Sequence, residues 1–156
     1  MNATFKKILV PVDFSPSSKL AVEHALALAG HFQGTVHVLH AWELPAYLRP
    51  DLTVWSGELN APLELHARGE AEKAMREFVA DTHLKDRPDV TTELRSGVLY
   101  STILAVAEQG EFDLIVMGTH GRTGFSHVVL GSVAEKIVRL AKCPVLTVRV
   151  PPESPR

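Results

Sequence analysis

The sequence KILVPVDFSPSSKLAVEHALALAGHF, residues 7–32, decides the fold class. It opens with an apolar run, Lys7–Val12, of the kind found in strands that are covered on both faces. Ser15 and Pro16 then mark a helix start, because serine is a favoured N-cap and proline suits the first helical position. Apolar residues follow at three- and four-residue steps, and Gly34 suits the end of the helix. A buried strand that leads into an amphipathic helix is the unit of an α/β sheet.

This strand–helix pattern repeats to the end of the chain. Further strands are expected at Thr35–Trp42, Val90–Ser96, Phe112–Met117 and Pro144–Val150. Further helices are expected at about Leu63–Thr82, Tyr100–Gln109 and Ser132–Ala141. The inward face of the last helix is expected to hold Ala134, Ile137, Val138 and Ala141. Strict alternation of strands and helices predicts a parallel sheet with right-handed crossovers and helices on both faces.

The polarity of the strands predicts their order in the sheet. Val90–Ser96 alternates apolar and polar residues, as an edge strand does, whereas the first and fourth strands are nearly continuous apolar runs that belong in the centre. We therefore expect an α/β, doubly wound, Rossmann-like sheet of five parallel strands in the order 3-2-1-4-5. A length of 156 residues predicts a single domain, 1–156, with a core of about 5–150.

The composition of the chain excludes several classes of protein. The chain is 46% hydrophobic and 22% charged, which is ordinary globular composition and excludes disorder. A formal net charge of −2 argues against a nucleic-acid partner, whose binding surface would be basic. No apolar run approaches a membrane span or a signal-peptide core, so no membrane partner and a cytoplasmic location are expected. Cys143, the single cysteine, excludes an internal disulfide and suits a small buried residue better than a reactive thiol.

One segment, Glu43–Pro62, fits neither a strand nor a helix. It contains three prolines and no clear hydrophobic period. Long loops of this kind in compact domains are often lids or binding loops. Two interpretations stay open, a loop that folds onto the body of the domain and a flap beside a ligand or partner.

The most informative segment for function follows the fourth strand. In a doubly wound sheet, ligands bind beyond the carboxyl ends of the strands where the strand order reverses, here between strands one and four. Pro11–Ser15 and Met117–Gly124 should line that crevice, and Gly131 with Ser132 opens the next helix. Glycines that lead to a helix N-terminus suit a phosphate site, although they could also serve only as turns. Neither a P-loop nor a G-x-G-x-x-G pattern is present.

The spacing Gly118-x2-Gly121-x9-Gly131-Ser132 resembles the nucleotide signature of the ATP-binding branch of the universal stress protein family. The opening Ile8–Ser15 and the later Gly118–Arg122 and Cys143–Val145 are similar to other signatures of that family, and the resemblance covers about Phe5–Val150. It implies a stress-response protein with a five-stranded α/β fold that is commonly dimeric. It also implies adenine-nucleotide binding, with ATP as the ligand and Mg²⁺ accompanying it.

The resemblance also implies roles for individual residues. Pro11, Val12 and Asp13 would flank the adenosine, with Asp13 near the ribose hydroxyls, and Ala41 would lie beside the adenine. Met117 and Gly118 would lie against the nucleoside, and the phosphates would be surrounded by Gly121, Arg122, Gly131, Ser132 and Val133. Two bland alternatives stay open, that Asp13 only organises the start of the first helix and that Arg122 is a solvated surface residue. No catalytic residue and no metal-binding set is expected among the protein side chains.

Three functions compete on this basis. The first is an ATP-binding module whose nucleotide changes its stability or its partners, and the second is a slow ATPase or autokinase. The third is a nucleotide-independent dimeric interaction protein. A homodimer is expected through the last strand, Val145–Val150, because an apolar edge strand invites pairing with a second copy. A phosphorelay receiver is excluded, since it needs an acidic residue after strand three and a lysine after strand five.

Overall fold

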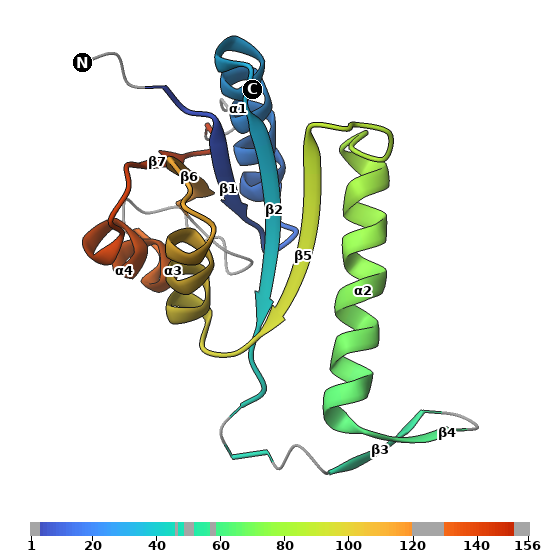
Figure 1. Ribbon diagram of the computed structural model, residues 1–156. Coiled ribbons are helices and arrows are strands. Elements are labelled where there is room, and N and C mark those ends of the chain that lie inside the picture. Colours follow the sequence, from blue (N-terminus) through green and yellow to red (C-terminus); the bar gives the residue numbers. More distant parts are fainter. Residues whose placement is uncertain (1–3, 46, 49–51, 57–58, 120–129, 152–156) are drawn as a thin grey trace, which may run out of the picture.

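The computed structural model describes residues 4–45, 47–48, 52–56, 59–119 and 130–151 (Figure 1). The strands are β1 Lys7–Pro11, β2 Thr35–Trp42, β3 Thr53–Ser56, β4 Leu59–Pro62, β5 Val90–Ser96, β6 Leu114–Gly118 and β7 Val145–Val148. The helices are α1 Pro16–Phe32, α2 Leu63–Asp81, α3 Leu99–Gln109 and α4 Ser132–Leu140. Within these described residues, no helix combines the length and the apolarity needed to cross a membrane.

The main sheet confirms the predicted topology. Its order is β5-β2-β1-β6-β7, and every neighbouring pair is parallel, which is 3-2-1-4-5 when only its own five strands are counted. Helices cover both faces, as the alternating sequence pattern predicts. The last strand is shorter than expected, because β7 ends at Val148 and Val150 lies beyond it with 44% of its surface exposed.

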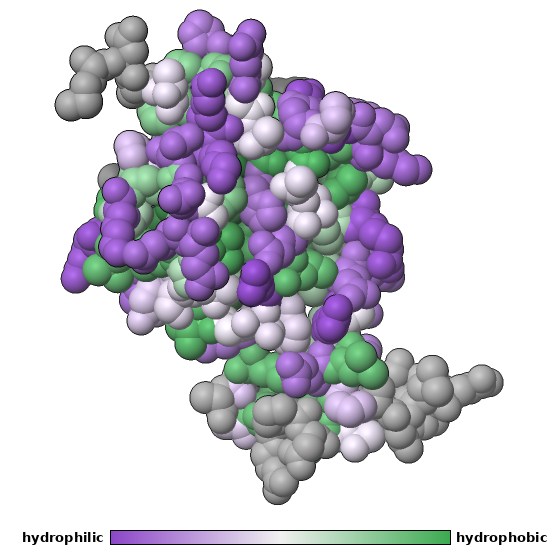
Figure 2. Space-filling model, viewed as in Figure 1, coloured by the Kyte–Doolittle hydropathy of each residue, from purple (hydrophilic) through white to green (hydrophobic). Residues whose placement is uncertain are grey.

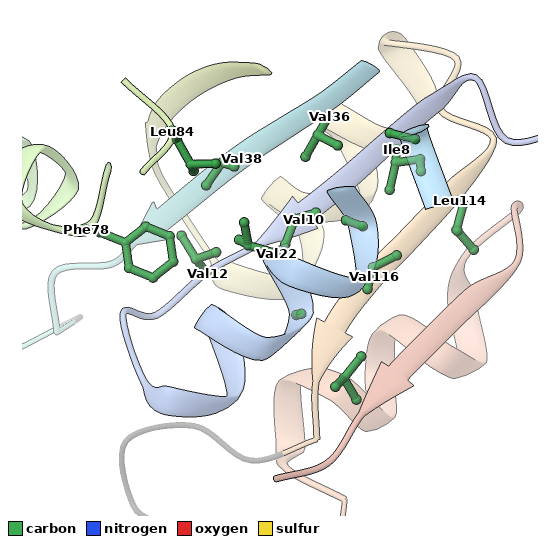
Figure 3. Packing of buried hydrophobic residues seen from close by; sticks show 14 of the residues in the cluster. Ile8, Val10, Val12, Val22, Val36, Val38, Phe78, Leu84, Leu114 and Val116 are labelled. Atoms are coloured by element: carbon green, nitrogen blue, oxygen red, sulfur yellow. The ribbon is translucent and has the colours of Figure 1, made fainter. Parts of the chain in front are cut away.

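The two faces of the sheet carry separate hydrophobic clusters. On one face, side chains of β1, β2 and β6 pack against α1 and α2, and Figure 3 shows Val10, Val22 and Val38 meeting in this layer. On the other face, Leu39 and Ile115 pack against α3 and α4. Each fully buried Val, Leu or Ile contributes about 1.5–3 kcal/mol relative to exposure. These layers hold the central strands β1 and β6 in place, and it is the carboxyl ends of those strands that form the site described below.

Helix α1 ends one residue before the position that its sequence suggests. Gln33 adopts the left-handed conformation with φ 54°, and the N–H of Gly34 then donates to the Ala29 carbonyl at 2.8 Å. Gly34 is needed for a different reason. A Cβ at this position would lie 2.7 Å from the carbonyl oxygens of both Phe5 and Lys6, so only glycine lets the chain return beside β1.

Helix α4 corrects one expected core position. Ala134 and Ile137 are buried, but Val138 is 47% exposed and Leu140 is 51% exposed. Val138 follows Ile137 by one residue, which places it about 100° further round the helix and outside the buried stripe. Part of the apolar surface of α4 therefore faces outward and does not join the core.

The segment between β2 and α2 contains a hairpin that its sequence did not predict. Strands β3 and β4 pair antiparallel as a sheet of their own, and Figure 1 draws this pair at the foot of α2, apart from the main sheet. The N–H of Leu63 donates to the Leu52 carbonyl at 2.7 Å and ties the hairpin to the start of α2. Tyr47 is 85% exposed and Leu52 is 46% exposed, so these two side chains are not folded onto the body of the domain.

Candidate functional site

A cavity of about 660 Å³ lies beyond the carboxyl ends of β1, β2 and β6. Its size falls within the range of about 300–1,000 Å³ that is usual for small-molecule sites. Three stretches contribute most of its wall, namely the β1–α1 turn, the end of β2 with the residues after it, and the end of β6 with the start of α4. The strand order reverses between β1 and β6, so the cavity occupies the position where doubly wound sheets bind ligands.

The β1–α1 turn is held by side-chain hydrogen bonds. The Oδ1 of Asp13 accepts from the N–H of Ser15 at 3.0 Å and from the Oγ–H of Ser18 at 2.7 Å. The N–H of Asp13 donates to Ser18 Oγ at 3.0 Å, and Ser15 Oγ caps α1 by accepting from the Ser18 N–H at 3.3 Å. Asp13 therefore does organise the start of the helix, and it also lines the cavity. The two roles are compatible, because a carboxylate has two oxygens with about four acceptor sites.

The next residue of this turn, Phe14, has a left-handed backbone with φ 67°. Such a conformation is uncommon for a bulky residue, and the surrounding contacts must hold it in place. Its ring packs against the imidazole of His40 with centroids 4.2 Å apart and against Phe78 at 5.5 Å. His40 is only 9% exposed, and its Nδ1 lies 2.8 Å from the carbonyl oxygen of Val12.

On the opposite side of the cavity, the start of α4 lies beside the end of β6. The N–H of Thr119 donates to the Val148 carbonyl at 3.0 Å, and the N–H of Gly131 donates to the Thr119 carbonyl at 2.8 Å. Gly131 is the N-cap of α4, with φ −59° and ψ 151°, and supplies no side-chain cap. The amides of Ser132, Val133 and Ala134 precede the first helical hydrogen bond, and all three residues line the cavity.

Gly131 and Gly118 both belong to the glycine signature, but the structure requires glycine at only one of the two positions. Gly131 adopts an extended backbone that any residue can adopt, so its φ does not require glycine. At Gly118, a Cβ would lie 2.5 Å from the Oγ and 2.8 Å from the Cβ of Ser17 in α1. The end of β6 therefore packs directly against the start of α1, and Gly118 is needed for that close approach as well as for its place in the cavity wall.

The end of β2 presents backbone groups to the cavity. β1 and β2 pair as far as Pro11 with Leu39, and the Val12 N–H then donates to the Leu39 carbonyl at 2.8 Å. The Trp42 carbonyl accepts instead from Gly97, on the β5 side of the strand. Because backbone groups alternate along a strand, the N–H and C=O of Ala41 face the β1 side, past the last residue pair. Ala41 thus offers a neighbouring donor and acceptor at the cavity wall.

The structure brings together nine of the eleven residues that the sequence assigns to the site. The nine that line the cavity are Pro11, Val12, Asp13, Ala41, Met117, Gly118, Gly131, Ser132 and Val133. The other two, Gly121 and Arg122, lie outside the described residues. The wall also includes residues that the sequence analysis did not select, among them His40, Trp42, Glu43, Leu99 and Ile103. For His40 the available signal was its place near the carboxyl end of β2, beside the switch point.

The ionisable side chains that line the described part of the cavity are Asp13, His40 and Glu43. Neither carboxylate suits an anion. Hydrogen-bond donors for an anion come instead from the first-turn amides of α4 and the hydroxyl of Ser132, at the positive end of that helix. The described wall is therefore acidic near β1 and β2 and donor-rich near α4.

Elsewhere, the described residues contain no group of three or more His, Cys, Asp or Glu side chains that could hold a metal ion. Burial raises the pKa of the Cys143 thiol, and Cys143 packs beside the cluster on the α3–α4 face. A raised pKa lowers the thiolate fraction at neutral pH, which fits a packing residue better than a nucleophile.

Comparisons with known proteins agree over nearly the whole chain. The sequence profile of the universal stress protein family matches residues 4–149. A universal stress protein of Methanocaldococcus jannaschii, MJ0531, is 35% identical over 148 residues, which are 94% of this chain and 84% of that protein. The solved structure of UspA from Lactobacillus plantarum superposes with a TM-score of 0.75 at 30% identity and covers 95% of this chain and all of that one. A universal stress protein solved in complex with cAMP shares the fold, with a TM-score of 0.66 at 20% identity, over 94% of this chain and 98% of that one.

Proposed function

This chain belongs to the universal stress protein family, and we propose that it binds an adenine nucleotide, ATP together with Mg²⁺, in the cavity at the switch point. One observation carries the proposal. The described part of the glycine signature lies in the wall of one cavity, which the first turn of α4 and the end of β1 both line at the switch point. Bound nucleotide would stabilise one state of the protein, so the protein acts as a nucleotide-responsive module of the stress response.

Each part of the nucleotide has a matching wall. The N–H and C=O of Ala41 suit the edge of adenine, where a ring-nitrogen acceptor lies beside an amino donor. The carboxylate of Asp13 suits the ribose hydroxyls, which can donate to it. The amides of Ser132 and Val133 and the hydroxyl of Ser132 suit the phosphates. Arg122 would add a bidentate cation there, and Mg²⁺ would offset the charge of the phosphates against the acidic wall.

A binding module fits this site better than an enzyme. The residues assigned to the phosphates, such as Gly131, Ser132 and Val133, provide donors and no group suited to take a proton from water. Asp13 already accepts two hydrogen bonds in its own turn. We therefore expect hydrolysis or autophosphorylation to be slow at most, and a steady-state rate above about 1 s⁻¹, the low end of ordinary enzymes, would contradict this.

Calorimetry and thermal unfolding with Mg-ATP test the proposal. At about 100 times its dissociation constant, a ligand selective for the folded state stabilises it by about 2.7 kcal/mol. GTP is the matched control for the base, and cAMP tests whether the triphosphate is required, since one protein of this fold was solved with cAMP. Binding of ATP in preference to GTP is the expected result. No heat and no thermal shift with any of the three would favour the nucleotide-independent interaction protein.

We also propose a homodimer through β7 and the adjoining surface of α4. β7 is an edge strand, and four apolar residues near it are exposed by 39–51%, namely Val138, Leu140, Leu146 and Val150. Figure 2 shows hydrophobic residues reaching the surface at the left of the view, where Figure 1 draws α4. A two-fold axis would pair the strand with its own copy and cover these side chains.

Light scattering tests the dimer. Leu146→Glu places a charge at a position of the edge strand β7 that is 39% exposed and should halve the measured mass, whereas Leu65→Glu is the matched control because Leu65 is 60% exposed on α2. A wild-type monomer, or a Leu146→Glu dimer, would contradict the interface.

A further inference from the structure

We propose that His40 is a positioning residue of the nucleotide site, which holds the Asp13 carboxylate where it meets the ribose hydroxyls. The inference deepens the proposed function and rests on it. His40 is 9% exposed and lies near the end of β2, where it reaches the turn that carries Asp13. It makes contact with the residue on each side of Asp13, with the carbonyl of Val12 and with the ring of Phe14.

The first contact fixes the chain before Asp13. β1 pairs with β2 only as far as Pro11, so Val12 lies just beyond the parallel register. Its N–H donates to the Leu39 carbonyl at 2.8 Å, and its carbonyl lies 2.8 Å from Nδ1 of His40. A carbonyl oxygen can only accept, so Nδ1 must carry the proton and donate. Both polar backbone groups of Val12 are thus bound to β2 at consecutive residues.

The second contact fixes the chain after Asp13. Phe14 has a φ of 67°, a conformation that costs free energy for a bulky residue and persists only when its surroundings hold it. The imidazole of His40 packs on its ring at 4.2 Å, and Phe78 of α2 closes the other contact at 5.5 Å. The aromatic contacts keep Phe14 directed into the core while the chain turns toward α1.

Asp13 therefore lies between Val12 and Phe14, and the side chain of His40 contacts both of them. Its Oδ1 bonds to Ser15 and Ser18 set its orientation relative to α1, whereas His40 sets the position of the whole turn relative to β2. Since Ala41 adjoins His40 on β2, the imidazole links the wall assigned to adenine with the carboxylate assigned to ribose. Loss of the Nδ1 donor should displace Asp13 relative to the base and weaken the ribose contact selectively.

The test compares ATP with 2′,3′-dideoxy-ATP, each with Mg²⁺, by calorimetry. In the wild type, loss of the hydroxyls should weaken binding about tenfold or more, as expected for hydrogen bonds to a charged group. In Asp13→Ala the two affinities should agree within about twofold. His40→Phe retains a ring against Phe14 but removes the donor. It should lower the ratio of the ATP affinity to the dideoxy-ATP affinity toward the value in Asp13→Ala. His40→Asn retains a donor near the Nδ1 position and should restore most of the ratio.

His37→Phe is the matched control, because His37 lies on the same strand but bonds to Thr91 and Glu93 on β5 and does not line the cavity. It should leave both affinities unchanged. If His40→Phe weakens both ligands equally, its role is only structural and the inference is wrong while the proposed function stands. Equal affinity of the wild type for both ligands also overturns the inference, and no binding of either by the wild type overturns the proposed function with it.

A second measurement is independent of any nucleotide. Nitrogen-15 NMR of the wild-type protein distinguishes the two imidazole tautomers, and comparison with His40→Asn assigns the His40 signals. We expect the neutral imidazole of His40 to carry its proton on Nδ1, because Nδ1 lies 2.8 Å from the Val12 carbonyl oxygen. A neutral His40 with its proton on Nε2 would remove the donor to Val12 and overturn the inference.

Discussion

The starts of α1 and α4 line the same cavity, but they differ in how many of their first-turn N–H groups have an acceptor within the protein. In α1, Pro16 has no N–H and the Ser18 N–H is taken by the Ser15 cap, so two of the three first-turn positions are closed by the protein itself. In α4, positions 132–134 all carry an N–H, and the Gly131 cap provides no side chain to accept from them. Of these two helix starts, α4 is the one whose N-cap residue leaves its first-turn N–H groups without a side-chain acceptor, and it is the one suited to an anion.

The difference originates in the two connections. The β1–α1 turn is short and polar, and Asp13, Ser15 and Ser18 exchange hydrogen bonds along it. At the other connection, Gly131 meets Thr119 through a backbone hydrogen bond, although eleven residues separate them in the sequence. Side chains thus stabilise one wall of the cavity and backbone groups form the other. The following substitutions test whether stability and ligand binding divide in the same way.

The largest effect is expected from Gly131→Asp. The observed backbone at Gly131, φ −59° and ψ 151°, resembles that of the Ser15 cap and accepts any side chain. Aspartate should cap α4 and raise its stability by a few tenths of a kcal/mol to about 1 kcal/mol. The same carboxylate would repel a phosphate about 4 Å away by about 4 kcal/mol at an effective dielectric of 20, so Mg-ATP affinity should fall at least about 100-fold.

The control for this substitution is Gly131→Ser, which supplies a cap without charge. It should gain a few tenths of a kcal/mol in stability and lose much less affinity than the aspartate variant. Calorimetry measures the affinities, and urea denaturation measures the free energies of unfolding. Unchanged ATP affinity in Gly131→Asp would mean that the phosphates do not lie at α4.

An intermediate effect is expected from Gly118→Ala, because the two walls touch at this residue. Its new Cβ would lie 2.5 Å from Ser17 Oγ and 2.8 Å from Ser17 Cβ, which forces the end of β6 away from α1. Overpacking of this kind costs about 1–3 kcal/mol. Thermal unfolding measures the loss, at about 2–4 °C for each kcal/mol in a chain of this size.

Adding Ser17→Gly to that variant removes both crowded side-chain atoms. The double variant should therefore lose less free energy of unfolding than the two single variants lose in total. We expect the difference, the coupling energy, to be at least about 0.5 kcal/mol. Additive losses would contradict direct packing between Gly118 and Ser17. Because the backbone carbon of Ser17 would still lie 3.2 Å from the new Cβ, recovery should be incomplete.

The sequence predicted the sheet and the place of the cavity for a physical reason. Apolar runs and the serine–proline start depend on local preferences, and the parallel topology then brings the ends of β1 and β6 together whatever their separation in the chain. What it did not predict depends on contacts between distant residues. The need for glycine at Gly118 comes from Ser17, and the role of His40 comes from a turn 26 residues earlier that includes the left-handed Phe14.

Helix ends and short strands were harder to predict for the same reason. Gln33 in place of Gly34 takes the left-handed position at the end of α1, and Gly34 is required instead for the close approach to Phe5 and Lys6. The hairpin β3–β4 has few residues, and its sequence carries no strict alternation. The helical period of α4 predicts that Val138 is in the core, but the structure leaves this side chain 47% exposed.

The smallest effect is expected from Ser15→Ala, at the helix start that the protein closes itself. The buried Ser15 Oγ accepts from the Ser18 N–H at 3.3 Å, and loss of an N-cap of this kind costs about 1 kcal/mol. Mg-ATP affinity should change by less than about twofold, since the phosphates are assigned to α4 and the bonds of Asp13 to the Ser15 N–H and the Ser18 hydroxyl do not require the Ser15 side chain. Urea denaturation at constant slope measures the free energy of unfolding, and calorimetry measures the Mg-ATP affinity.

Ser101→Ala, on the exposed side of α3, is the control, and its free energy of unfolding should stay within about 0.5 kcal/mol of the wild-type value. An affinity loss in Ser15→Ala larger than its loss of stability would assign the phosphates to α1 and reverse the division between the two helix starts.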